Sequence, residues 1–324
     1  MAINSKGKIE ITDLDFDAVK SNFKTFLSQQ NGFTDYNFEG SGMSVLMDLL
    51  AYNTHYQAFH ANMLANEMFL DTTLLRASAV SHAKALGYLP TSMKASNALV
   101  TVTVKGVPIT QTSLTMTAGS VFTTSVNDTS YQFVTIADHT ATSDTGTFQF
   151  DDIPIFEGTR VNYTYTVDST NLEQQFLIPS SSVDTGTLVV RVQTSASDTT
   201  TETYKLNTDF TTLDANSKVY FLQEVEEGRF EVYFGDGVFG YKPIDGNIII
   251  LDYVVTNGAL ADGASAFTAA STVGGYSNVT ALATASASGG GFAETVDSIK
   301  FNAPLKYASQ GRAVTPDDYK YDRT

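Results

Sequence analysis

The sequence predicts an α+β fold, in which an N-terminal long-helix bundle precedes an antiparallel β-rich domain and then a short helical segment. Apolar residues recur at helical spacing up to about residue 70 and alternate with polar residues from residue 99. Ser and Thr are concentrated between Asn97 and Thr212, which favours strands and turns over helices. The predicted regions are a helical core-bundle region (1–96), a β-rich domain (97–268), a flexible connector (269–292) and the helical start of a further domain (293–324).

The first helix is predicted to begin in an acidic stretch. Asp13, Asp15 and Asp17 place carboxylates where the positive end of a helix dipole favours them. They also resemble the opening of a calcium loop, but the Gly and Glu that such a loop requires are missing at their offsets. The apolar residues that follow share one face: Phe16, Val19, Phe23, Phe26 and Leu27. Asn31-Gly32 is expected to end the helix.

The second helix is predicted to start from a cap at Ser41 or Ser44 and to run to about Leu70. Its apolar residues recur at a spacing close to 3.5, the repeat of a coiled-coil seam, and Asn53, His60 and Glu67 take alternate seam positions. The predicted helix seam, which is a subunit interface if the bundle is intermolecular, consists of Leu46, Leu49, Leu50, Asn53, Tyr56, His60, Met63 and Leu64. A helix of this length indicates packing along its side. Periodicity alone leaves an intramolecular and an intermolecular bundle equally open.

A third helix is predicted over 74–86, capped by Thr72 or Thr73, closed by Gly87 and stopped by Pro90. Period-two runs then indicate short antiparallel strands in a sandwich or barrel-like arrangement. The runs are 99–104, 121–123, 131–134, 148–150, 161–167, 188–192, 219–222, 230–234 and 248–255. Residues 269–291 are rich in Ala, Ser and Gly, which predicts the connector. A last helix is expected over 293–308, with Pro304 at a kink or boundary.

Composition excludes several classes of protein. The chain has 324 residues and no Cys, so it carries no disulfide, catalytic thiol or Cys-type zinc site. Its net charge is −16, and residues 97–290 hold 7 Lys and Arg against 21 Asp and Glu. That surface would repel a nucleic acid, and it is expected to face water or a basic partner. No apolar run approaches the length of a membrane span, and the first residues lack the apolar core of a signal peptide.

The sequence offers no clear catalytic motif. The four histidines, His55, His60, His82 and His139, form no metal-binding pattern. The sequence contains no Gly-x-Ser-x-Gly elbow, no Gly-x-x-x-x-Gly-Lys phosphate loop and no Gly-x-Gly-x-x-Gly that opens a helix. Paired carboxylates occur at Asp151 and Asp152 and near Glu224, Glu226 and Glu227, but any acidic β-protein offers such pairs. We therefore expect no catalytic residue, no cofactor and no metal.

One glycine-rich cluster, residues 234–246, carries local information. It follows one predicted strand and precedes another, so it is not a phosphate loop that feeds a helix. Glycines supply positive φ and close backbone approach, Asp236 can accept from turn amides, and Pro243 fixes a bend. The predicted structural turn motif consists of Gly235, Asp236, Gly237, Gly240, Pro243 and Gly246.

These residues resemble a known family. The turn motif, with Tyr253 and residues 256–258 after it, is similar to the signature region of the baseplate J family of contractile phage tails. The stretch that follows in that family resembles Ala303-Pro304 and RAVTPDDY at 312–319. The segments YNFEGS at 36–41, DLLAYNT at 48–54 and GYLPTS at 87–92 resemble baseplate wedge subunits of T-even-type myophages.

The resemblance implies a structural, non-enzymatic tail protein in the virion baseplate, assembled in the host cytoplasm. In that family two copies of the subunit join one copy of another wedge protein through a helical core bundle, and six wedges surround a hub. This favours an intermolecular seam on the second helix and places Asn53 in it, where a polar side chain can fix register. A rearrangement would pass through these interfaces when the sheath contracts.

The chain departs from that family in length, because T-even-type wedge subunits continue past the 312–319 segment. It is therefore expected to be a fragment with a missing C-terminal region, or a shorter relative. Two other classes of function stay open. One is a β-rich glycan-binding or adhesive module with a helical attachment region, although the chain has no Trp platform. The other is a hydrolase that uses Asp151 or Asp152.

Overall fold

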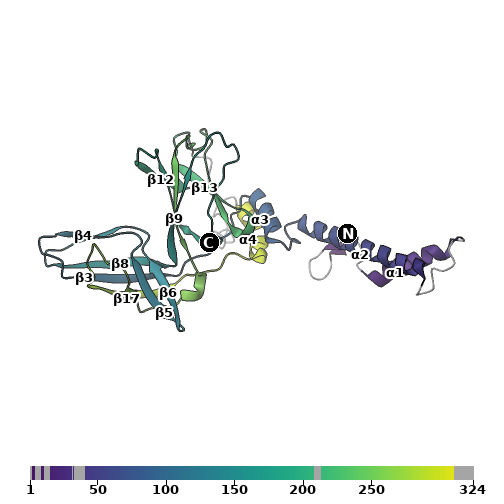
Figure 1. Cartoon of the computed structure of the whole chain (residues 1–324), viewed down its shortest axis with the longest axis horizontal. Coiled ribbons are helices and arrows are strands. Elements are labelled where there is room, and N and C mark those ends of the chain that lie inside the picture. The colour runs from purple at the N-terminus through teal and green to yellow at the C-terminus, as the bar shows by residue number, and fades with distance from the viewer. Residues whose placement is uncertain are drawn as a thin grey trace. The chain divides into compact units, whose positions relative to one another are not determined.

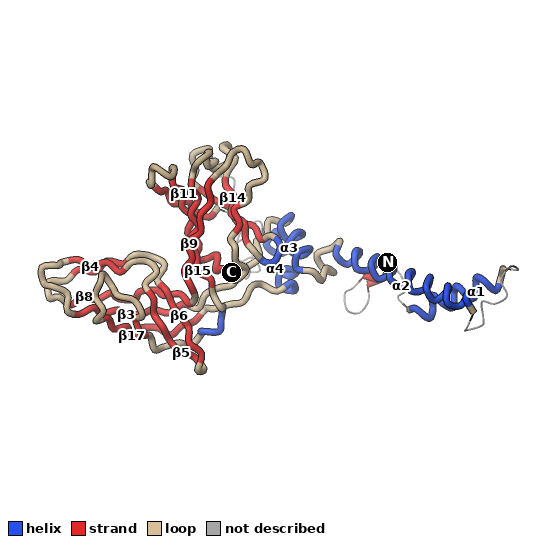
Figure 2. The backbone as a smooth tube through the Cα atoms, in the orientation of Figure 1, coloured by secondary structure: helices blue, strands red, loops and turns tan. Residues whose placement is uncertain are grey.

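The computed structural model describes residues 2–3, 9–10, 15–30, 32, 41–207 and 213–309. The chain forms two compact units, a helical unit of residues 1–88 with 295–324 and a β unit of residues 89–294. Figure 1 labels those of their elements for which there is room, and Figure 2 colours helices blue and strands red. The resemblance segments at 36–40 and 312–319, and the predicted helix residues Asp13 and Asn31, lie outside the described residues.

The helical unit contains the three predicted N-terminal helices. They are α1 (Phe16–Ser28), α2 (Gly42–Glu67) and α3 (Arg76–Ala85), with short strands β1 (Ala2–Ile3) and β2 (Ile9–Glu10) paired antiparallel. The Asp15 carboxylate caps α1 by accepting from the N–H of Asp17 at 2.9 Å. Of the two caps predicted for α2, the structure uses Ser41, whose hydroxyl oxygen accepts from the N–H of Ser44 at 3.1 Å.

The start of α3 differs from the prediction. Its N-cap is Leu75, and neither Thr72 nor Thr73 caps it. The Glu67 carboxylate accepts from the N–H of Leu74 at 2.9 Å and the N–H of Leu75 at 3.3 Å, while the Thr73 hydroxyl donates to the same carboxylate. A side chain from the end of α2 thus satisfies the amides at the start of α3, a relationship that no local cap pattern reveals.

A second correction concerns α4 (Val296–Ser309). Its Ile299 and Ala303 are fully buried with Val80 and its neighbours on α3. The described part of 293–324 is therefore a member of the helical unit, not the start of a separate domain. Pro304 lies inside α4 and does not end it.

The β unit contains a seven-stranded and a six-stranded sheet. The seven-stranded order is β10-β14-β13-β12-β11-β15-β9, with all neighbours antiparallel except β12 and β13. Its strands are β9 (Thr159–Thr166), β10 (Phe176–Leu177), β11 (Val183–Gln193), β12 (Thr201–Leu206), β13 (Val219–Glu224), β14 (Phe230–Phe234) and β15 (Ile248–Val255). The predicted antiparallel β-rich region is confirmed.

The six-stranded order is β16-β5-β6-β8-β3-β17. Its strands are β3 (Asn97–Lys105), β5 (Val121–Val126), β6 (Thr129–Val134), β8 (Thr147–Glu157), β16 (Thr268–Ala269) and β17 (Val279–Ser288); β4 (Ser113–Met116) pairs separately with β7 (His139–Thr142). The prediction of a flexible connector over 269–292 is wrong for residues 279–288. Within it β17 pairs with β3, and Ala281 and Ala283 pack on the core, because small side chains on a regular strand fill shallow positions.

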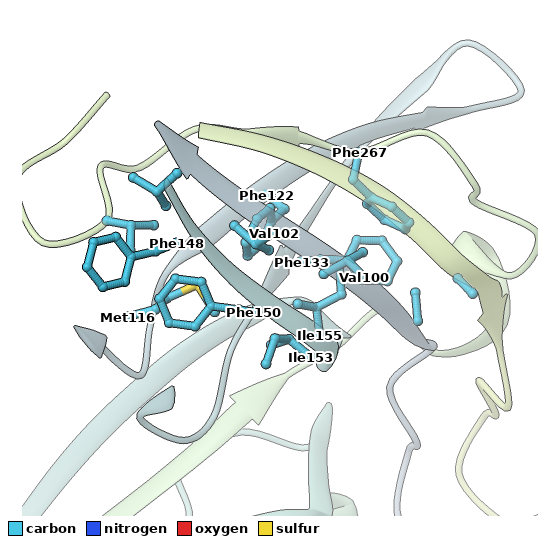
Figure 3. Packing of buried hydrophobic residues seen from close by; sticks show 14 of the residues in the cluster. Val100, Val102, Met116, Phe122, Phe133, Phe148, Phe150, Ile153, Ile155 and Phe267 are labelled. Atoms are coloured by element: carbon cyan, nitrogen blue, oxygen red, sulfur yellow. The ribbon is translucent and has the colours of Figure 1, made fainter. Parts of the chain in front are cut away.

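Each sheet has its own hydrophobic core. Phe122, Phe133 and Phe267 pack together in the six-stranded core, where the rings of Phe133 and Phe267 meet edge to face with centroids 5.0 Å apart (Figure 3). The core of the seven-stranded sheet centres on Tyr253, Phe230 and their aliphatic neighbours.

Buried polar groups link the two sheets. Glu157, at the end of β8, is 1% exposed and accepts from the Thr256 hydroxyl at 2.6 Å and the Asn257 N–H at 2.9 Å, just after β15. On β9, Arg160 donates to the Ala118 carbonyl at 2.9 Å and pairs with Asp252 of β15. The Glu157 bonds join β8 of the six-stranded sheet to the residues just after β15 of the seven-stranded sheet, and the Arg160–Ala118 bond joins β9 to the loop before β5, so these bonds hold the two sheets together.

Candidate functional site

The α2 helix carries the predicted interface, and one of its faces is already covered. Small or short side chains make up most of that face: Ser44, Met47, Ala51, Ala58, Asn62, Ala65 and Asn66. At 100° per residue these positions cluster on one side of the helix. α1 packs along α2, and the Lys20 ammonium lies 2.5 Å from the Asp48 carboxylate.

The opposite face of α2 carries large apolar side chains that are exposed. Leu49 is 63% exposed and Leu64 is 69% exposed, and all eight predicted seam residues are exposed. The sequence pattern missed Val45 and Tyr52, which lie beside the heptad seam and are 64% and 55% exposed. One feature of the sequence could have identified them, namely the near absence of charge along the helix. Asp48 and Glu67 are the only charged residues among the 26 residues of α2.

The α2 helix therefore carries hydrophobic side chains on both its covered and its exposed sides. Such a helix is ordinarily buried on all sides, since water does not stabilise a large apolar surface. On the exposed side the apolar side chains extend over about half of the circumference, from Phe59 to Leu50. This arc is wider than the stripe that packs against a single partner helix.

The middle of this face forms a groove of about 480 Å³, lined by Leu49, Leu50, Tyr52, Asn53 and Tyr56. Four of these residues are spaced i, i+3, i+4 and i+7. In a coiled coil that spacing forms the hole that receives one side chain of a partner helix. The groove places the polar Asn53 among apolar neighbours.

Aromatic rings line the groove and continue along the face to His60 and Phe59. Tyr52 and Tyr56 have centroids 5.3 Å apart, and Tyr56 and His60 have centroids 5.5 Å apart. The Phe59 ring meets His60 at 5.8 Å. These contacts connect successive helix turns and hold the rings in place before any partner binds.

The end of α2 is fixed electrostatically. Burial by itself would raise the pKa of Glu67, but hydrogen bonds from Thr73, Ser78 and the amides of Leu74 and Leu75 outweigh it and hold that pKa below its usual value. The ionised carboxylate thus stabilises the start of α3.

The predicted turn motif connects β14 with β15. The Asp236 carboxylate accepts from the N–H groups of Val238 and Phe239 at 2.8 and 2.9 Å, and these bonds lower its pKa. A Cβ at Gly235 would overlap the main-chain oxygens of Phe239 and Gly240. In the same motif Gly237, Gly240 and Gly246 have positive φ and Pro243 is buried. The motif is a tightly bonded loop whose Val238 and Phe239 side chains are exposed.

The other predicted chemical groups do not come together. The Asp151 carboxylate accepts from Gln149 at 2.6 Å, Asp152 is exposed beside it, and Glu224 is buried at the end of β13. Of the histidines, His82 bonds to the main chain of Glu67. Across the described residues no three His, Cys, Asp or Glu side chains gather as a metal site would require. No helix in the described part of the chain is long and apolar enough to cross a membrane.

Comparison with known proteins places the helical region in a family. Residues 15–88 match the model described as "Baseplate wedge protein gp6-like, helical domain". The curated "Baseplate wedge protein gp6" of Enterobacteria phage T4 is 30% identical over 332 aligned positions, which cover 94% of this chain and 48% of that protein. The chain therefore spans about half the length of the curated relative that it matches.

A solved structure is also similar. The cryo-EM structure of the anti-feeding prophage baseplate, 6-fold symmetrised, includes a chain with 12% identity that matches 96% of this chain and 63% of its own length. The TM-score is 0.34, and a likeness at that level carries no argument about function.

Proposed function

The helical region of this chain, residues 15–88, belongs to the gp6-like baseplate wedge family, and from that premise we propose that α2 joins a helical core bundle with a second copy of the chain and another wedge protein. The chain is a structural component of the phage tail baseplate. The proposal concerns how it is held there.

The exposed face of α2 is the observation that carries the proposal. Leu46, Leu49 and Leu64 are each more than half exposed on a helix that α1 covers only from another side. Burying one such side chain is worth about 1.5–3 kcal/mol. A partner that covered this face would bury several such side chains, and each would add its own burial free energy to the stability of the complex. This supports a seam between chains and not a bundle made only of the chain's own helices.

The groove around Asn53 supports helices as the partners. A side chain from another helix fits a hole of i, i+3, i+4 and i+7 residues, while a flat sheet surface offers no such projection. The width of the exposed apolar arc leaves room for more than one partner helix.

The β unit would serve as a stiff arm during sheath contraction. Its two sheets are joined by the bond between Glu157 and the buried Thr256 and by the bond between Arg160 and the half-buried Ala118, which precedes β5. A unit joined in this way passes a displacement from one end to the other instead of bending between its sheets.

The experiment compares Leu49→Lys and Leu64→Lys with Thr54→Lys, an exposed polar control on α2. Each variant is co-expressed with the other wedge proteins of its phage, and wedge formation is measured by size-exclusion chromatography with light scattering. We expect both leucine variants to lose wedge assembly and the control to retain it.

Wedges that form equally well with all three variants would contradict the shared bundle. Amide hydrogen exchange provides a second measurement on the chain without partners. A well-folded monomer whose residues 41–67 are already fully protected would also contradict the shared bundle.

A further inference from the structure

Strand β6 has a partner strand on both sides along only a third of its length. It pairs with β5 from Thr129 to Val134, but β8 pairs only with Phe133 and Val134 on its other side. Past that point the chain of β8 turns at Gly158 into β9, which belongs to the other sheet. Residues 129–132 of β6 therefore have one open edge.

The direction of the main-chain groups follows from the ladder. The Gln132 carbonyl accepts from the Gly158 N–H at 2.8 Å, so Gln132 is directed away from β5. In an antiparallel ladder alternate residues share this direction, and Ser130 is therefore directed the same way. Within the part of the chain that the structure describes, the N–H and C=O of Ser130 have no main-chain partner.

The open edge faces a groove of about 570 Å³. Its lining residues are Thr129, Ser130, Tyr131, Gln132, Glu157, Gly158, Thr159, Ser182, Val255, Thr256, Asn257 and Leu260. No Lys or Arg is among them. Glu157 is the charged member, and Thr256 and Asn257 already bond to its carboxylate. The groove thus offers hydroxyl and amide groups, two main-chain groups and a partly apolar wall.

We propose that this groove receives an extended segment of a neighbouring baseplate polypeptide, which adds to β6 as a strand. Open main-chain groups on a strand edge are satisfied by another strand, and side-chain hydroxyls flank the path on both sides. Residues 129–132 have no partner strand on this side, and at about 3.4 Å per residue they fit a guest segment of about four residues, which would bond to the N–H and C=O of Ser130. The guest segment is uncharged or basic, because the groove contains Glu157 and the surrounding region 97–290 has 21 acidic against 7 basic residues.

This inference rests on the proposed place in a baseplate, but it does not depend on the α2 bundle. Ser130→Pro tests it, because proline removes the N–H that faces the groove and leaves the bonds between β5 and β6. Ser125→Pro is the matched control. Ser125 lies directly opposite Ser130 in the ladder, and its N–H is directed to the other edge of the hairpin. Ser182→Trp is a second variant, which fills the groove from a lining residue outside β6.

The measurement is made on tails assembled with each variant, after the melting temperature of the free chain shows that it is folded. We expect exchange of the Ser130 amide to slow at least 100-fold on assembly of the unaltered chain. We also expect Ser130→Pro and Ser182→Trp to lower the yield of complete baseplates at least tenfold, and Ser125→Pro to leave it unchanged.

Two outcomes separate this inference from the proposed function. If the chain enters the baseplate while the Ser130 amide exchanges as fast as in the free chain, and both groove variants assemble normally, the strand-addition site is refuted and the baseplate role stands. If Leu49→Lys assembles normally while Ser130→Pro does not, the groove is supported and the α2 bundle fails.

Discussion

The Nε2 atom of His82 lies 2.9 Å from the main-chain carbonyl oxygen of Glu67, so α3 donates to the last residue of α2. The Glu67 side chain runs the other way and accepts from the amides that precede α3. The two helix ends thus satisfy each other, one through a carbonyl and the other through a carboxylate. This corner holds the end of the candidate interface helix.

We expect Glu67→Gln to destabilise the helical unit by about 1 kcal/mol at pH 7, because it weakens a charged cap. The folded pKa of Glu67 is lowered, so its contribution is complete above the unfolded pKa of about 4.3 and is lost as pH falls through the folded pKa. Urea unfolding at pH 7 and below pH 4 measures both effects. The exposed Asp71→Asn is the control, and equal behaviour of the two variants would contradict the cap.

Asn53→Leu is expected to make the wedge bundle more stable and less specific. A polar residue in an apolar seam fixes register and partner number at a cost in stability. Because Asn53 is exposed in the chain itself, the free energy of unfolding without partners should change by less than about 0.5 kcal/mol. Native mass spectrometry of co-expressed wedges reports the stoichiometry. A single stoichiometry identical to that of the unaltered chain would disprove the register role.

Gly235→Ala and Gly246→Ala separate two reasons for glycine in the turn motif. A Cβ at Gly235 meets main-chain oxygens that cannot move aside, so we expect a loss of about 3 kcal/mol. At Gly246 the space is open and only the positive φ of 82° is strained, for a loss of about 1 kcal/mol. Chemical denaturation of the full chain compares them. Equal losses would mean that close approach does not constrain Gly235.

Asp252→Asn is expected to destabilise the β unit by about 3 kcal/mol. The Asp252 side chain is 6% exposed and pairs with Arg160 and Arg191, so the change leaves two guanidinium groups without their carboxylate. Thermal unfolding monitored by circular dichroism measures the loss, and the exposed Asp144→Asn serves as the control. A loss no larger than that of the control would show that the two arginines find other partners.

Local pattern predicted most elements of the fold. The period of α2 and the alternation of polar and apolar residues in β3 follow directly from side-chain geometry. The candidate interface was also readable from the heptad spacing of Leu49, Asn53 and Tyr56. The pattern failed at β17, because small side chains look like a linker until a neighbouring strand supplies their hydrogen bonds.

The sequence by itself determined the α+β class, the long apolar helix and the loop around Asp236, since each depends on residues that are close in the chain. Only the tertiary structure decided that Glu67 caps α3, that α4 packs on α3, and that β8 leaves residues 129–132 of β6 unpaired on one side. These features join residues far apart in sequence or depend on where a strand changes sheet. Local propensity cannot encode them, because their hydrogen bonds and buried surfaces exist only once the chain has folded.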